Sequence, residues 1–211
     1  MEHRLNELGK KMGTTLVISR HRPETADDTE TATLLAAKFN VSVLDIPLVY
    51  DFPADSPVIE RLRSLSPPAY YLVPLSQRSV KSLLTFLRIP YADVFETTDT
   101  VQIPDGGIAG GQIERLDENP AARWYPLIDD SKCSACLECV NYCLFGVYTI
   151  GADSRPLVDQ PDACRDGCPA CSRVCPSKAI MFPLYEDRVI AGYDPPPTDD
   201  MSNLINLVDQ I

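Results

Sequence analysis

Eight cysteines gathered in one short part of the chain are the residues best suited to chemistry in this sequence. All of them lie between positions 133 and 175 of the 211 residues. They form two runs, Cys133-x2-Cys136-x2-Cys139-x3-Cys143 and Cys164-x3-Cys168-x2-Cys171-x3-Cys175. The last three cysteines of the two runs are 32 positions apart and the first are 31 apart. This spacing indicates an internal repeat in which the second copy carries one extra residue.

Thiolates at this density are typical of iron-sulfur ligation, because each iron corner of a cubane cluster needs one soft thiolate. Three cysteines on a tightly wound loop can reach three corners of one cube, and the fourth thiolate must come from elsewhere in the chain. Two other interpretations stay open. Two zinc sites would normally use separated C-x2-C pairs, and four disulfides would require an oxidising compartment.

About residues 125 to 185 resemble the bacterial-type ferredoxins that carry two [4Fe-4S] clusters. Beside the cysteines, PLIDDSKC is similar to the first strand of that family, VYTI with RPLVD to its hairpin, and CPSKAIMF to its last segment. The resemblance implies crossed ligation, in which the fourth cysteine of each run serves the other cluster. The implied ligands are Cys133, Cys136, Cys139 and Cys175 for the first cluster, and Cys164, Cys168, Cys171 and Cys143 for the second.

Two positions depart from the pattern of that family. The second run has the extra residue between Cys164 and Cys168, and we expect Gly167 to give this longer loop the backbone freedom it needs. Leu144 follows Cys143, where the family often has proline. Proline stiffens the backbone, so its absence bears on the surroundings of Cys143 and on the cluster potential.

The first 132 residues contain no cysteine, and short apolar runs alternate there with helical patterns. Strands are predicted at 14–19, 41–46 and 70–73. Helices are predicted after the caps Ser56 and Ser76, and around Leu34, Leu35 and Phe39. Alternating strands and helices indicate parallel βαβ units. The predicted fold class is therefore α/β plus α+β, with a small three-layer parallel-sheet domain followed by the ferredoxin-like domain.

The change in pattern and cysteine content predicts the division of the chain. We expect an N-terminal extension over 1–12, the α/β domain over 13–118 and the two-cluster domain over 119–190. A proline-rich linker and a short helix are expected over 191–211, where apolar residues recur at helical spacing.

Ligands of open α/β sheets bind beyond the carboxyl ends of the strands. That rule places Arg20, His21 and Arg22 after the first strand, and Ser76 and Gln77 at the helix that follows the third. Donors at a helix start can hold an anion, which makes these five residues a candidate anion site. The alternative is that the arginines pair with nearby acidic side chains, namely Glu24, Asp27 and Asp28.

The stretch LVISRHRPETADD followed by VSVLDIPL faintly resembles one half of the small class II chelatases, where a histidine follows the first strand. The resemblance implies tetrapyrrole binding near His21. That family also has a later histidine, and the only other histidine here is His3.

The formal net charge is −11, and an acidic protein is a poor partner for nucleic acid. No apolar run is long enough for a membrane span or a secretory signal, so we expect a cytoplasmic protein. Eight cysteines would fill all eight iron corners of two clusters and leave none for substrate. We therefore expect single-electron transfer to a redox enzyme with a basic docking surface, the α/β domain serving in docking, dimerisation or anion binding. The alternative is a ligand-binding enzyme or sensor whose clusters supply or report electrons.

Overall fold

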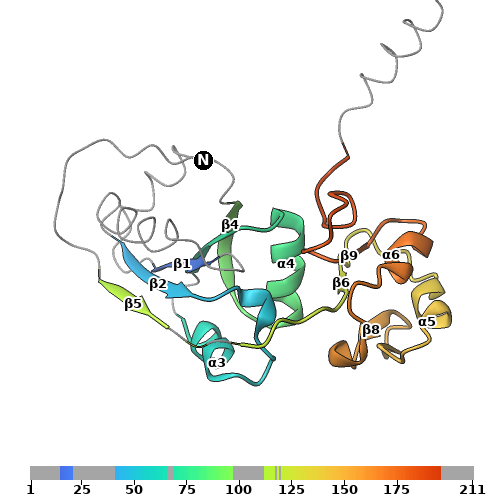
Figure 1. Cartoon of the computed structure of the whole chain (residues 1–211), viewed down its shortest axis with the longest axis horizontal. Helices are drawn as coiled ribbons and strands as arrows, with labels where there is room; N and C mark the ends of the chain where they lie inside the picture. Colours follow the sequence, from blue (N-terminus) through green and yellow to red (C-terminus); the bar gives the residue numbers. More distant parts are fainter. Residues whose placement is uncertain are drawn as a thin grey trace, which may run out of the picture.

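The computed structural model describes residues 15–20, 41–65, 69–96, 112–116, 118 and 120–195 (Figure 1). Its main feature is a five-stranded, wholly parallel sheet in the order β4-β3-β1-β2-β5. The strands are β1 (Thr15–Ser19), β2 (Ser42–Ile46), β3 (Ala69–Val73), β4 (Tyr91–Glu96) and β5 (Ile113–Arg115). The first three confirm the predicted strands. β4 and β5 were not among the predicted strands.

Both predicted serine caps are present. Ser56 accepts a hydrogen bond from the N–H of Ile59 at the start of α3 (Pro57–Arg63), whose first residue is proline. Ser76 accepts from the N–H of Ser79 at the start of α4 (Gln77–Phe86). Such side chains satisfy amide groups that have no partner within the helix, and so they fix where the helix begins.

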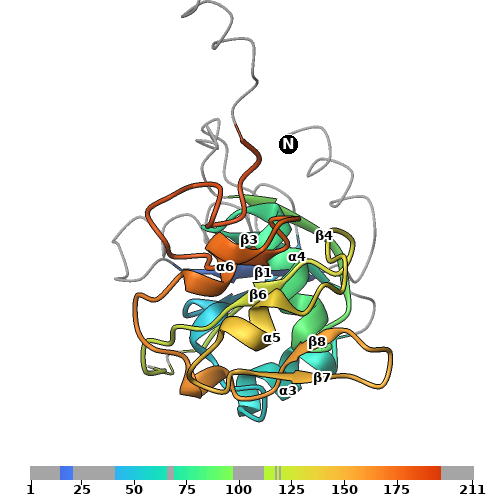
Figure 2. The ribbon, with the colours of Figure 1, turned by 90° about the vertical axis from the view of Figure 1, so that its right-hand side faces the viewer.

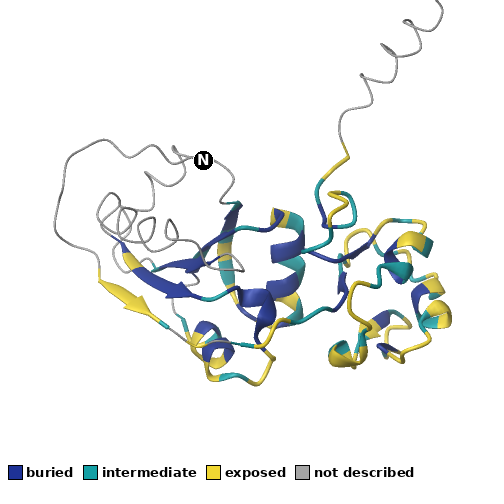
Figure 3. Cartoon of the chain, viewed as in Figure 1, coloured by how far each residue is buried: buried dark blue, intermediate teal, exposed yellow. Residues whose placement is uncertain are grey.

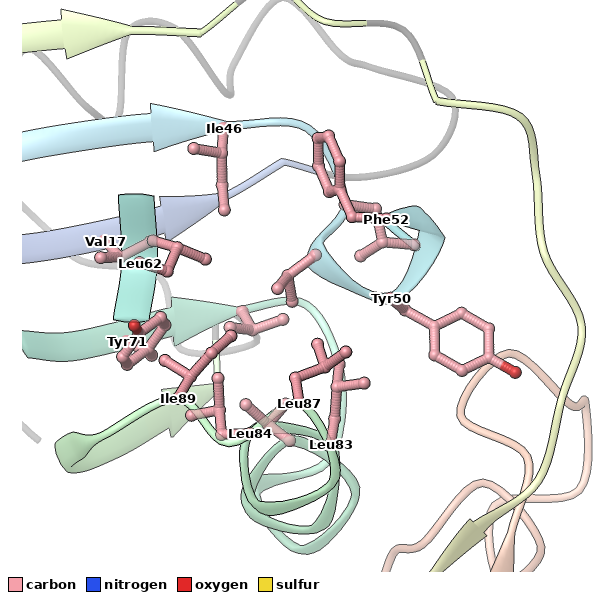
Figure 4. Close-up of a cluster of buried hydrophobic side chains, with 14 of the residues drawn as sticks. Val17, Ile46, Tyr50, Phe52, Leu62, Tyr71, Leu83, Leu84, Leu87 and Ile89 are labelled. Carbon is pink, nitrogen blue, oxygen red and sulfur yellow. The ribbon is translucent and has the colours of Figure 1, made fainter. Parts of the chain in front are cut away.

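The core of the α/β part lies between the sheet and these two helices. Val17, Leu62, Tyr71, Leu83 and their neighbours form one buried cluster (Figure 4). Alternate strand residues, among them Leu16, Ile18, Val43 and Leu72, are buried as well. Burial of both faces is typical of parallel sheets. The helix predicted around Leu34, Leu35 and Phe39 lies outside the described residues, as does the C-terminal helix.

The cysteine-containing part has two small antiparallel sheets and two short helices (Figure 2). β6 (Leu127–Ile128) pairs with β9 (Ile180–Met181), and β7 (Tyr148–Ile150) pairs with β8 (Pro156–Val158). These pairs confirm the strand expected before Cys133 and the expected hairpin. The helices are α5 (Glu138–Tyr142) and α6 (Ala170–Val174), and a 3-10 turn, η2, spans Pro161–Ala163. A second 3-10 turn, η1 (Val49–Asp51), follows β2 in the α/β part.

The cysteine-containing part packs at the carboxyl ends of the parallel strands. Tyr125, Leu127 and Met181 belong to the same buried cluster as α3 and α4. In Figure 1 the arrow of β2 points toward this part, and Figure 3 shows buried residues on both sides of the junction. The edge where open α/β sheets usually bind ligands is therefore in contact with the rest of the chain.

No helix within the described ranges is long and apolar enough to cross a membrane.

Candidate metal centre

Three neighbouring cysteines and one that is distant in sequence line one pocket. Cys133, Cys136 and Cys139 come from the loop and helix of the first run, and Cys175 follows α6 of the second run. The backbone of the first loop winds tightly, because Ala135 and Leu137 have φ values of 56° and 62°. The pocket thus contains the cysteine set that the ferredoxin resemblance implied for the first cluster.

The other four cysteines interact with one another. Burial is the main cause that raises the pKa of Cys164 and of Cys171. Charge interactions raise it further, from Cys171, Cys168 and Cys143 at Cys164 and from Cys143 and Cys168 at Cys171. The loop with the extra residue turns at Gly167, whose φ of 71° lies in the left-handed region that favours glycine. A Cβ atom there would have no neighbour within 4 Å, so the glycine serves the backbone conformation and not close packing.

Burial keeps several of these thiols protonated in the absence of a metal. Desolvation, with further contributions from neighbouring thiols, raises the pKa of Cys139 to about 11. The same main cause raises the pKa of Cys164 and of Cys171 to about 12. Thiolate, not thiol, is the form that binds metal, so these cysteines would release protons as iron binds.

Cys175 differs from these three because its pKa is lowered and not raised. Burial alone would raise its pKa, but hydrogen bonds from Ser177 and from backbone N–H groups outweigh burial and lower it. The N–H of Ala179 lies 3.3 Å from its sulfur, and the hydroxyl oxygen of Ser177 lies 3.5 Å from it. Such donors stabilise a thiolate and tune an iron-sulfur cluster.

The eight thiols are all free of disulfide bonds. Among the described residues, no group of three or more His, Cys, Asp or Glu side chains is placed to hold a single metal ion. The two groups of four fit a cubane in their chemistry, since each thiolate of a cubane binds a different iron.

Three of the five α/β residues expected to hold an anion lie in the described part of the chain, and these three are engaged within the protein. Arg20 is buried and pairs with the carboxylate of Asp45 at 3.3 Å, while its guanidinium donates to the carbonyl of Leu116 at 2.5 Å. Its observed partner is therefore Asp45; Glu24, Asp27 and Asp28 lie outside the described residues, as do His21 and Arg22.

Ser76 and Gln77 are likewise occupied. The buried hydroxyl of Ser76 caps α4 and donates to the carbonyl of Ala191 at 3.2 Å. The N–H of Gln77 donates to the carboxylate of Glu96 at 2.9 Å. A carboxylate of the protein itself thus lies at the helix start where the anion was expected.

Arg78 of α4 binds two loops beside the first cysteine pocket, one before Cys133 and one after Cys175. Its guanidinium donates to the carboxylate of Asp129 at 2.6 Å and to the carbonyl of Lys178 at 2.5 Å. The carbonyl of Asp129 in turn accepts from the N–H of Cys133 at 3.0 Å. Helix α4 therefore supports the loop that leads into Cys133 and the loop that follows Cys175.

Residues 123 to 125 connect the second cysteine group to the α/β part. Arg123 pairs with Asp162 at 2.8 Å and donates to the carbonyl of Phe52 at 2.9 Å. Trp124 donates to the carbonyl of Cys168 at 3.3 Å. Neither these residues nor Arg78 stood out in the sequence, because their partners are distant in the chain.

No protein-family model matches the chain, so the faint chelatase resemblance gains no support. The chain is 39% identical over 61 residues to an uncharacterized ferredoxin of Methanocaldococcus jannaschii. The match covers 28% of this chain and 41% of that protein, so the chain spans about two fifths of the length of the curated relative it matches. This similarity supports a ferredoxin-like domain in the chain.

Proposed function

We propose that this protein transfers single electrons through two [4Fe-4S] clusters with crossed ligation. The first cluster would be held by Cys133, Cys136, Cys139 and Cys175, and the second by Cys164, Cys168, Cys171 and Cys143. The observation that carries the proposal is the pocket in which Cys175, from the second run, meets three cysteines of the first. The similarity to a ferredoxin supports iron-sulfur electron transfer as the chemistry.

When bound, each cluster would accept and release one electron without change of its ligands. The protein's own groups would hold the thiolates in place and offer hydrogen bonds to their sulfurs, as Ala179 and Ser177 do at Cys175. All four thiolates of each cluster come from the chain, which leaves no iron corner for a substrate.

The α/β part serves, in this proposal, as a scaffold for the cysteine-containing part. Arg78 supports the first cysteine pocket, and residues 123 to 125 support the second group. The net charge of −11 favours a redox partner with a basic docking surface, since complementary charge speeds the encounter of two proteins.

Iron analysis of paired cysteine variants tests the proposal and the crossing together. The unmodified protein should contain about eight iron atoms per chain after reconstitution, with spectra of two cubane clusters. With crossed ligation, Cys136→Ala with Cys175→Ala removes two ligands of one cluster, and about four irons remain.

The matched control is Cys136→Ala with Cys143→Ala, which removes one ligand from each cluster. Crossed ligation then predicts damage to both clusters, whereas ligation within each run predicts damage to one. Retention of four irons in this second variant and loss of both clusters in the first would refute the crossing. Binding of zinc in place of iron would refute the function itself.

A further inference from the structure

Tyr148, the first residue of β7, has a buried hydroxyl beside the second cysteine group. The residue is 7% exposed. Among the described residues, its hydroxyl has no partner that meets the full distance and angle requirements of a hydrogen bond. A buried polar group without a partner costs free energy, so such a group calls for a specific acceptor.

The acceptor with which this hydroxyl interacts is the sulfur of Cys171. Burial is the main cause that raises the pKa of Tyr148. Charge and hydrogen-bond interactions with Cys171 come next, followed by charge interactions with Cys139 and Cys143. In the other direction, the hydroxyl of Tyr148 lowers the pKa of Cys171 against the effect of burial. The neutral thiol is a weak acceptor, whereas a metal-bound thiolate would be a strong one.

The internal repeat gives Tyr148 a counterpart. Cys143 and Cys175 are equivalent in the two runs, which makes Ile180 the counterpart of Tyr148. Ile180 is buried and lines the pocket of the first cysteine group, so an apolar side chain stands there in place of the hydroxyl.

A second pair shows the opposite arrangement. Ser177, whose hydroxyl lies 3.5 Å from the sulfur of Cys175, corresponds to Phe145 in the first half of the repeat. The hydroxyls of Tyr148 and Ser177 therefore come from different positions of the repeat and approach different cysteine ligands.

A hydrogen bond to a cysteine sulfur stabilises the reduced state of a cluster more than the oxidised state. The added electron places more negative charge on the sulfurs, and a fixed donor interacts more strongly with that charge. Loss of the donor should therefore lower the reduction potential of the cluster concerned.

We propose that Tyr148 and Ser177 set the potentials of the two clusters separately, Tyr148 through the sulfur of Cys171 and Ser177 through that of Cys175. The inference rests on the proposed function, because it assigns these sulfurs to different clusters. Both are positioning residues: neither binds iron, and each acts through a ligand.

Potentials measured cluster by cluster test the inference in Tyr148→Phe and Ser177→Ala. The hyperfine-shifted proton NMR signals of the ligand cysteines, followed during a redox titration, report each cluster by itself. Tyr148→Phe should lower the potential at Cys171 and leave the potential at Cys175 unchanged, and Ser177→Ala should do the reverse. A tenfold change in the ratio of reduced to oxidised cluster corresponds to 59 mV for one electron, and we expect shifts of about this order.

Each variant serves as the control of the other, and both keep the packing of the replaced side chain nearly unchanged. Two clusters with unshifted potentials in both variants would overturn the inference and leave the proposed function intact. Equal shifts of both clusters in either variant would overturn it too, because a general structural change would move both. Too little iron in the unmodified protein would instead remove the proposed function, and the inference with it.

Discussion

Tyr50 and Tyr125 bind each other reciprocally through side chain and main chain. The hydroxyl of Tyr50 donates to the carbonyl of Tyr125 at 2.5 Å and accepts from its N–H at 2.7 Å. The hydroxyl of Tyr125 donates to the carbonyl of Tyr50 at 2.9 Å, and the rings stack with centroids 4.3 Å apart. One residue follows β2 and the other precedes β6, so this pair joins the two parts of the chain.

The two tyrosines should differ in what they contribute to stability. Tyr50→Phe leaves two buried main-chain groups of Tyr125 without a partner, and Tyr125→Phe leaves only the carbonyl of Tyr50. Each such group costs about 1–3 kcal/mol. Thermal unfolding followed by circular dichroism should therefore show a larger loss for Tyr50→Phe. Tyr70→Phe, at a partly exposed tyrosine of β3, is the control, and an equal loss in all three variants would contradict the account.

Gly192 lets the segment after β9 pack against the start of α4. Its φ is +99°, and a Cβ atom there would lie 2.2 Å from the hydroxyl oxygen of Ser79 and 2.6 Å from that of Ser76. Both hydroxyls donate to the carbonyl of Ala191. Gly192→Ala should therefore detach this segment and increase hydrogen exchange at the start of α4.

Gly146→Ala is the control for Gly192→Ala, because it separates backbone strain from the collision of the added methyl group. Gly146 has a φ of +69°, but no atom lies within 4 Å of the point that an added methyl group would occupy, so alanine adds backbone strain without a collision. The strain alone costs about 1–2 kcal/mol. Unchanged exchange at α4 in Gly192→Ala would show that the packing there tolerates the added methyl group.

Arg78 should contribute more to the stability of the first cysteine pocket than an exposed arginine would. Its ion pair with Asp129 is largely buried, with side chains 16% and 13% exposed. Arg78→Met leaves this carboxylate and the carbonyl of Lys178 without the arginine, at a cost of about 1–3 kcal/mol. We expect faster loss of iron from the cluster at Cys133 and Cys175, measured with a chelator.

Arg61→Met is the matched control for Arg78. Arg61 pairs with Glu114 at 3.2 Å, but these side chains are 46% and 52% exposed. Ion pairs in water contribute at most about 1 kcal/mol, so iron release should stay unchanged. Equal rates in the two variants would mean that Arg78 does not support the cysteine pocket.

Tyr71 makes stability depend on pH in the alkaline range. Burial raises its pKa above the ordinary tyrosine value, and its hydroxyl has no hydrogen-bond partner among the described residues. The unfolded chain loses the tyrosine proton above about pH 10 while the folded protein keeps it. The stability contribution is thus present below that pH and is lost as the pH rises toward the folded pKa.

Tyr71→Phe should remove this part of the pH dependence. The free energy of unfolding of the iron-loaded protein, measured between about pH 9 and 11, should fall less steeply with pH in the variant, by up to about 1.4 kcal/mol per pH unit. At neutral pH the variant should be as stable as the unmodified protein or more so, because it buries no hydroxyl. Identical slopes would show that Tyr71 does not titrate on unfolding.

Short apolar runs and helix caps in the sequence predicted three strands and the starts of two helices. β1, β2 and β3 are buried runs, and the starts of α3 and α4 are fixed by serine caps within three residues. β4 was missed because Val94 and Phe95 are its only fully buried residues, and its place is decided by pairing with β3. All three residues of β5 are exposed, so it shows no hydrophobic pattern at all.

The candidate site shows the same division. The ferredoxin resemblance implied the four cysteines of the pocket, three of which lie close together in the chain. Ser76 was predicted both as a cap and as an anion donor; the cap is confirmed, but Ala191, 115 residues later, takes the hydroxyl proton. Tyr148 reads in the sequence only as a strand residue, because the neighbour of its hydroxyl is set by tertiary packing.

The buried cluster that contains Leu83, Tyr125 and Met181 has a consequence for how the chain unfolds. The apolar faces of α4, β6 and β9 are covered by one another, so neither part can lose its structure without exposing the other. The sheet and the cysteine-containing part should therefore melt in a single cooperative transition. The cysteine-containing part cut out alone would carry an exposed apolar face that favours aggregation.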